Sequence, residues 1–85
     1  MAENTPVEEL RSLVLYLATT LVGNPEGIDV VAEQRGPTVQ LNLRVPESDL
    51  GRVIGKEGRI ARAMRTIVTI TSARHNLHAR LEIDA

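Results

Sequence analysis

A four-residue segment, Gly55-Lys56-Glu57-Gly58, constrains the fold more than any other feature of this chain, because it interrupts a helical pattern. Apolar residues recur at helical spacing on both sides of it, which predicts a short helix over residues 46–54 and a second helix over residues 59–71. The end of the second helix, residues 66–71, consists of six β-branched residues, whose propensity favours a strand. The helical spacing nevertheless continues through them, so we expect helix to about Thr71. The apolar positions of the two helices are Leu50, Val53, Ile54, Ile60, Met64, Ile67 and Val68.

The remaining elements are one helix and three strands. The helix begins at Thr5-Pro6, an N-cap residue followed by proline at the first helical position, and ends at Gly23-Asn24-Pro25. Two strands joined by a turn at Arg35-Gly36-Pro37 form an antiparallel hairpin, and a third strand follows the helix pair. The strands are predicted over residues 28–34, 38–45 and 77–84. The order α-β-β-α-α-β predicts a two-layer α+β domain, with a three-stranded mixed sheet and three helices on one face.

The length of 85 residues leaves room for one domain, over residues 1–85, with about residues 1–5 as a flexible N-terminus. The start of the chain is polar and acidic, and the longest apolar stretch, residues 13–22, is too short to span a bilayer. We therefore expect a cytoplasmic protein that does not enter a membrane. Leu13, Leu15 and Val22 widen the apolar face of the first helix, either as a deeper core contact or as a surface for a partner.

The composition excludes several classes of site. The chain has no cysteine, which rules out disulfides, thiolate nucleophiles and cysteine-based metal centres. Tyr16 is its one aromatic residue, so the chain cannot form the base-stacking platform of several nucleic-acid-binding folds. His75 and His78 have no third metal ligand nearby in the sequence. Two histidines and scattered acidic residues also do not provide a nucleophile, a base and a residue that orients the base. We therefore expect no enzyme, no metal site and no cofactor.

The net charge of −1 hides an uneven distribution of charge along the chain. Residues 50–80 carry seven basic side chains and one acidic side chain, whereas residues 1–49 carry three basic and eight acidic ones. The single lysine, Lys56, lies in the glycine segment, and Arg59 and Arg62 share one edge of the helix that follows. The positive end of the molecule is therefore expected at the glycine segment.

A Gly-x-x-Gly turn before a helix suits phosphate, because the missing side chains let a ligand approach the backbone amides at the helix N-terminus. A P-loop has the pattern Gly-x-x-x-x-Gly-Lys followed by Ser or Thr. Here Gly51 and Gly55 are one residue too close, and Glu57 stands at the hydroxyl position, which excludes a nucleotide hydrolase. The other phosphate-binding turn of this form is the KH loop, which holds the backbone of about four nucleotides of a single strand.

The run from Leu50 to Val68, which contains Gly-Arg-Val-Ile-Gly-Lys-Glu-Gly-Arg, resembles the signature of the small bacterial KH-domain RNA-binding proteins of the KhpA family. The order of the elements resembles that of a type II KH domain. The resemblance implies binding of single-stranded RNA at the glycine loop and in an adjoining groove with aliphatic walls. The residues that it implies for RNA binding are Arg52, Val53, Ile54, Gly55, Lys56, Glu57, Gly58, Arg59 and Arg62.

Two positions depart from the family pattern. Ala61 stands where the KH pattern has a larger aliphatic residue, which predicts a shallower groove floor. Glu57 places a negative charge where phosphate is expected. At an exposed position this charge costs about 1 kcal/mol or less, so it weakens the binding of phosphate without preventing it.

The resemblance further implies a biological setting. Members of the family are RNA chaperones or post-transcriptional regulators, and they form homodimers or heterodimers with a larger KH-domain protein of the Jag type. They are linked to cell shape and cell-wall biogenesis, and no small-molecule substrate is implied. The alternative is a protein-interaction or assembly module of KH fold with weak or vestigial RNA binding. Glu57, the acidic residues 1–49 and the surplus leucines of the first helix favour this alternative.

Overall fold

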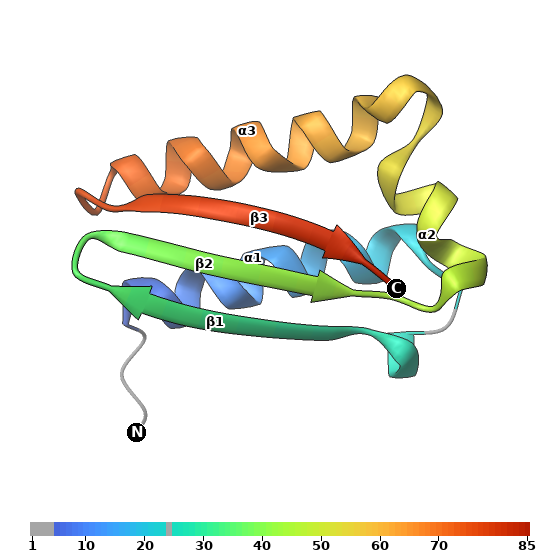
Figure 1. Ribbon diagram of the computed structural model, residues 1–85, viewed down its shortest axis with the longest axis horizontal. Coiled ribbons are helices and arrows are strands. Elements are labelled where there is room, and N and C mark those ends of the chain that lie inside the picture. The colour runs from blue at the N-terminus through green and yellow to red at the C-terminus, as the bar shows by residue number, and fades with distance from the viewer. Residues whose placement is uncertain (1–4, 24) are drawn as a thin grey trace.

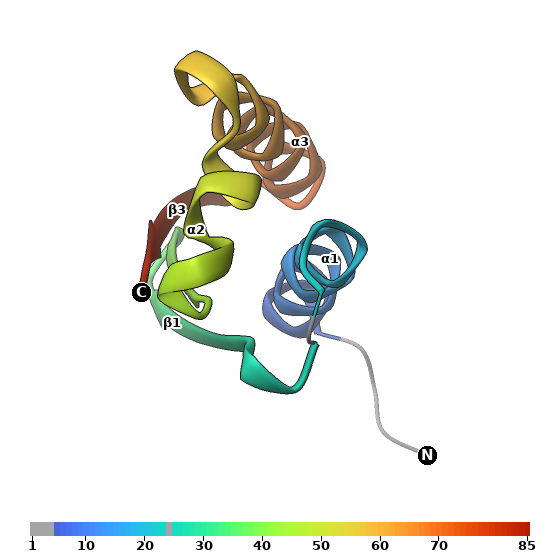
Figure 2. The same cartoon turned by 90° about the vertical axis from the view of Figure 1, so that its right-hand side faces the viewer.

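The computed structural model, which describes residues 5–23 and 25–85, has two layers, with a three-stranded sheet on one side and three helices on the other (Figure 1, Figure 2). The expected α+β class and the order α-β-β-α-α-β are confirmed. The elements are α1 (Pro6–Leu21), β1 (Asp29–Arg35), β2 (Thr38–Arg44), α2 (Glu47–Ile54), α3 (Arg59–Ala73) and β3 (His78–Asp84), with short 3-10 turns at Pro25–Gly27 and Lys56–Gly58. Residues 1–4 of the predicted flexible N-terminus and Asn24 of the predicted turn after the first helix lie outside the described residues.

Strand β2 is the central strand of the sheet, as the crossover predicted. It pairs antiparallel with β1 and parallel with β3. Every second residue of β2 faces the helices, and Val39, Leu41 and Leu43 are all fully buried there. Leu41 stands between Ala32 of β1 and Leu81 of β3, so the three strands bring their apolar side chains to one face.

Helix α1 begins as the sequence indicates, with the Thr5 hydroxyl accepting a hydrogen bond from the amide of Glu8 at 3.2 Å. Its buried face consists of Leu10, Val14 and Ala18. Leu15 and Val22 are half-buried and pack against the hydrophobic core, so the first of the two expectations for these residues, a deeper core contact, holds for them.

Helix α3 includes all six β-branched residues of the ambiguous run, 66–71. Its buried line consists of Ala61, Met64, Val68 and Ser72, whose spacing of three and four residues keeps them on the side that faces the sheet. The burial of these four side chains against the sheet stabilises the helix more than the local strand propensity opposes it. The prediction that Ile67 belongs to the buried stripe is wrong: Ile67 is 40% exposed, because it precedes Val68 by one residue and points to a neighbouring side of the helix. Ile70 is 59% exposed on the same helix.

Among the described helices, none is long and apolar enough to cross a membrane.

Candidate nucleic-acid interface

The Gly-x-x-Gly segment forms a tight turn between α2 and α3 at one end of the molecule (Figure 1, Figure 2). The backbone φ angles of Gly55, Glu57 and Gly58 are all positive, at 78°, 59° and 73°. The amide of Gly58 donates to the carbonyl of Gly55 at 3.1 Å, which closes the turn. Glycine adopts such angles freely, whereas for Glu57 the left-handed conformation costs about 1 kcal/mol.

The two glycines of the turn have different roles. A Cβ added to Gly55 would lie 2.6 Å from Cγ1 of Ile60, so this glycine lets Ile60 pack directly behind the loop. A Cβ added to Gly58 would meet no described atom within 4 Å. Gly58 therefore lies under open space, through which a ligand can approach the backbone.

The N-terminus of α3 is open to a ligand. Gly58 is its N-cap residue, and no side chain makes a capping hydrogen bond there. The first amide groups of a helix have no partner within the helix, and the helix dipole adds a partial positive charge at this end. This is the arrangement that binds phosphate at helix N-termini.

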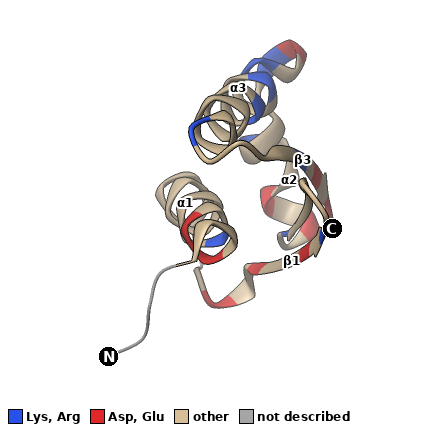
Figure 3. Ribbon diagram, turned by 90° about the vertical axis from the view of Figure 1, so that its left-hand side faces the viewer, with Lys and Arg blue, Asp and Glu red and all other residues tan. Residues whose placement is uncertain are grey.

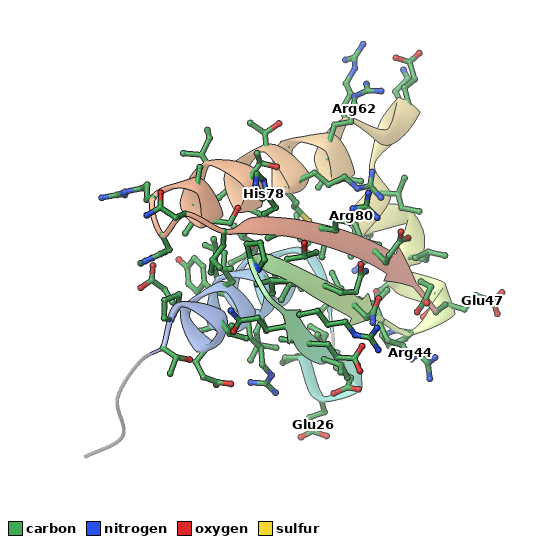
Figure 4. All side chains as sticks on the ribbon, turned by 60° about the vertical axis from the view of Figure 1, so that its left-hand side comes forward. Glu26, Arg44, Glu47, Arg62, His78 and Arg80 are labelled. Atoms are coloured by element: carbon green, nitrogen blue, oxygen red, sulfur yellow. The ribbon has the colours of Figure 1, made fainter. Side chains whose placement is uncertain are left out.

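Basic residues gather at this end of α3 and in the loop before it, while most acidic residues lie on other elements (Figure 3). Lys56 and Arg62 are exposed, and their side chains make no hydrogen bond or ion pair with any residue in the described part of the chain. Arg62 lies at the loop end of α3 (Figure 4). Nη2 of Arg59 is 3.1 Å from Oε1 of Glu57, so within the loop the acidic side chain is already paired with a basic one. The sequence-predicted loop residues are thus brought together, with Glu57 and Arg59 paired.

The other predicted residues lie apart from the open end of the loop. Nη1 of Arg52 is 3.6 Å from Oδ1 of Asp49 and would lie 3.4 Å from a Cβ on Gly23, so this side chain extends toward the end of α1. Val53 is fully buried in the hydrophobic core. Its side chain therefore supports α2 from behind and lines no open groove, which corrects the prediction. Ile54 is half-buried beside the loop.

A groove runs along the seam between α3 and β3, and its lining residues are not those that the resemblance implied. It consists of two adjoining depressions of about 310 and 340 Å³, which share Thr69 and Ala79. The depression nearer the loop end of α3 also contains Arg65, Arg80, Leu81 and Glu82. Figure 4 shows Arg80 and His78 on β3, beneath α3. These residues come together through the parallel pairing of β3 with β2 and the packing of α3 on the sheet. The one available signal was the continuation of the basic edge of α3 to Arg65.

The two histidines form no metal site in the described residues, where no group of three His, Cys, Asp or Glu side chains could hold a metal ion. Nε2 of His75 is instead 3.1 Å from Oε2 of Glu9, which joins the loop after α3 to the first turn of α1. His78 is exposed at the start of β3.

Comparison with known proteins identifies the family. A family model described as the KhpA/KhpB KH domain matches residues 11–83. The RNA-binding protein KhpA of Listeria monocytogenes is 38% identical over 74 residues, which are 87% of this chain and 97% of that protein. The protein of the same name from Bacillus subtilis is 37% identical over 76 residues, or 89% and 94% of the two chains. The one from Aquifex aeolicus is 42% identical over 74 residues, or 87% and 94%.

A solved structure has the same fold. The crystal structure of a point variant of Aquifex aeolicus Era bound to GDP and AlF4− superposes with a TM-score of 0.66 over 93% of this chain. The match covers 30% of that longer chain at 16% identity, so it shows the fold alone. The family of the sequence relatives is not an enzyme family, which confirms the prediction that the chain is no enzyme. The chain belongs to the KhpA/KhpB family of KH domains.

Proposed function

We propose that this protein binds single-stranded RNA in the cytoplasm, holding the sugar-phosphate backbone at the Gly-x-x-Gly loop and the bases along the groove between α3 and β3. The observation that carries the proposal is the uncapped N-terminus of α3, which lies under open space at Gly58 and beside Lys56 and Arg62. The relatives, each called an RNA-binding protein, support the same ligand.

The backbone of the strand is held in this proposal by amide groups and by charge. The N-terminal end of α3, which no side chain caps, binds one phosphate through its backbone and the helix dipole, and Lys56 and Arg62 bind the neighbouring phosphates. Arg59 joins them once a phosphate replaces the carboxylate of Glu57 as its partner. Three or four such contacts give a slope of roughly −2 to −3 for log affinity against log salt, or about 20- to 50-fold weaker binding at 200 mM than at 50 mM salt.

A charge-matched pair of variants tests the loop. The double variant Lys56→Asp/Glu57→Asp lowers the net charge by 2, and aspartate tolerates the left-handed angle of position 57. Arg35→Asp makes the same change of charge in the β1–β2 hairpin. In fluorescence polarisation with a labelled U-rich octamer, the double variant is expected to bind about tenfold more weakly or worse, with a shallower salt slope. The RNA affinity of Arg35→Asp is expected to stay within about twofold of that of wild type. Its charge lies on the hairpin, where salt screens it from RNA that is bound at the loop. Equal losses in the two variants, with unchanged circular dichroism, would refute the clamp.

Dimer formation is the second part of the proposal, either with another copy or with a larger KH-domain partner of the Jag type. Ile67 and Ile70 of α3 support it, because both are large apolar side chains left exposed. One short RNA site binds weakly, and joining two of them raises the apparent affinity through effective concentration.

Sedimentation tests the dimer. Ile70→Glu is expected to produce a monomer, whereas Tyr16→Glu, which changes the exposed aromatic residue of α1, keeps the wild-type mass. A wild-type protein that is monomeric at about 100 μM, where interfaces of 10⁻⁶ M affinity are saturated, contradicts the homodimer. A pull-down with a Jag-type protein then decides the heterodimer.

The cellular part of the proposal is a role as an RNA chaperone or post-transcriptional regulator linked to cell shape and cell-wall biogenesis. Its support is the family membership. Crosslinking followed by sequencing of the bound RNA tests it, and transcripts unrelated to the envelope would contradict the link. The paired charges of Glu57 and Arg59 favour a second candidate, an assembly module with vestigial RNA binding. The absence of any RNA shift by wild-type protein at low salt would support that candidate.

A further inference from the structure

Arg65 is fixed in the groove between α3 and β3 by its own side chain. Its Nε donates a hydrogen bond of 3.2 Å to the backbone carbonyl of Leu81, at a partly buried position on the free edge of β3. This contact uses one of the five N–H donors of the guanidinium. The two terminal nitrogens make no hydrogen bond or ion pair with the described residues, so an end-on fork of donors remains free in the groove.

A carboxylate lines the same depression. Glu82 follows Leu81 on β3, and its carboxylate has no ion pair or hydrogen bond within residues 5–23 and 25–85. Ala79 and Leu81 form the apolar part of the lining. The depression therefore presents a fork of donors, a pair of acceptor oxygens and an apolar floor. Its volume of about 310 Å³ is at the lower limit of small-molecule sites, which suits a single base.

We propose that this depression selects guanine, with Arg65 donating to O6 and N7 and Glu82 accepting from N1–H and the N2 amino group. The inference rests on the proposed function and names the base that the groove takes. A phosphate presents acceptors only, so it would pair with Arg65 or with Arg80 of the same lining but would leave the Glu82 carboxylate without a donor. Adenine has an amino donor next to N7 in place of the second acceptor, and uracil has no pair of adjacent acceptors. Guanine alone has two adjacent acceptors on one edge and two adjacent donors on another, and its pairing with arginine is the commonest specific contact of a base.

The position of Arg65 along α3 agrees with this assignment. Arg65 is six residues after Arg59, the first residue of α3, which corresponds to about 9 Å along the helix axis. A KH loop holds about four nucleotides, so a base of the strand that is held at the loop reaches this depth in the groove. The positive charge at the loop then provides affinity for the RNA backbone, and the base site farther along α3 provides specificity for sequence.

The experiment compares binding of two RNA octamers, U8 and U8 with one central guanosine, by fluorescence polarisation. Wild-type protein is expected to prefer the guanosine octamer by about 5- to 150-fold. Replacing that guanosine by 7-deazaguanosine removes the N7 acceptor, and replacing it by inosine removes the N2 amino donor. Each replacement is expected to lose a large part of the preference. Equal affinity of wild type for U8 and the guanosine octamer would overturn the inference and leave the proposed function intact. Failure to bind either octamer would overturn both.

Variants then assign the contacts. Arg65→Lys keeps the positive charge but lacks the fork, so the ratio of the two affinities is expected to fall to about one, with 7-deazaguanosine no longer distinguished. The Glu82→Gln variant is expected to bind the inosine and guanosine octamers with more similar affinities than wild type does, because its side chain no longer offers two acceptor oxygens to N1–H and the N2 amino group. Arg62→Gln, one turn nearer the loop, is expected to weaken both octamers by the same factor, and Arg74→Gln, at the far end of α3, to leave the ratio as in wild type. A guanosine preference that survives Arg65→Lys would overturn the assignment.

Discussion

The two ends of helix α3 differ in what satisfies their backbone groups. At the first end Gly58 serves as the N-cap with no side-chain hydrogen bond, and a Cβ there would touch no described atom. At the other end the carbonyl of Ser72 accepts hydrogen bonds from the amides of His75 and Leu77 at 3.0 and 2.9 Å. Asn76 has a positive φ of 59° in this turn.

Side chains complete the second end and leave the first one open. The hydroxyl of Ser72 donates to the carbonyl of Thr69 at 3.0 Å and accepts from the amide of Ala79 at 3.3 Å. His75 then connects this turn to Glu9 of α1. Side chains thus close one end of the helix, while at the other end the amides of Gly58 and Arg59 donate to loop carbonyls and no side chain adds a cap. The difference predicts that changes at the first end affect RNA binding and changes at the second affect stability alone.

The largest expected effect separates the two glycines of the open end. Gly55→Ala forces a methyl group to within 2.6 Å of Ile60 at a φ of 78°, and should lower the free energy of unfolding in urea by about 2–3 kcal/mol. Gly58→Ala has no clash, so its cost is about 1 kcal/mol from the positive φ, while the added methyl group obstructs the ligand and weakens RNA binding. Equal destabilisation by the two single variants would show that the glycines do not differ in role.

An intermediate effect is expected at the closed end. Ser72 is 1% exposed, and Ser72→Ala leaves the amide of Ala79 without its partner, which should destabilise the fold by about 1–2 kcal/mol. The affinity for RNA should change by less than about twofold. Ser12→Ala on the exposed side of α1 is the matched control, and it should leave thermal unfolding nearly unchanged. A large loss of RNA affinity in Ser72→Ala would contradict the proposal that the two ends of α3 have different roles.

The smallest expected effect concerns the ion pair of the loop. Glu57→Gln removes the carboxylate that competes with phosphate for Arg59, so RNA affinity at 50 mM salt should rise by about two- to fivefold. The gain should shrink at higher salt, because the pair is exposed and screened. Glu33→Gln, on β1, makes the same change of charge far from the loop. An equal gain in both variants would assign the effect to net charge rather than to the pair.

Much of the fold could be predicted, because local and tertiary preferences agree along most of the chain. The β-branched run 66–71 is the exception, and there the spacing of Ile60, Met64 and Val68 indicated the correct element, since burial against the sheet outweighs propensity. The helix continues through Ser72 to Ala73, two residues beyond the predicted end. The glycine turn was placed correctly between two helices because glycine favours the positive φ angles that Gly55 and Gly58 adopt there.

The site was less predictable, because exposure depends on neighbours that are distant in sequence. Val53 follows the motif residue Arg52 but faces the core, since α2 packs against the sheet and α3 through that side. A groove beside the loop was expected from the resemblance, but the residues that line it were not predicted. Arg65 and Leu81 are 16 positions apart, and the register of β3 beside β2, together with the packing of α3 on the sheet, determines which carbonyl faces Arg65.

The parallel pairing of β2 with β3 also has a consequence for the order of folding. Strands β1 and β2 are neighbours in sequence and are joined by a short turn, whereas β3 pairs with β2 only after residues 45–77 have crossed the sheet. Contacts between distant residues form more slowly than local ones, so we expect β3 to dock late, which pulsed hydrogen exchange would detect as late protection of its amides. A partly folded chain then has a glycine loop that attracts phosphate but no groove that recognises a base. Selectivity for RNA sequence is therefore acquired only in the last step of folding.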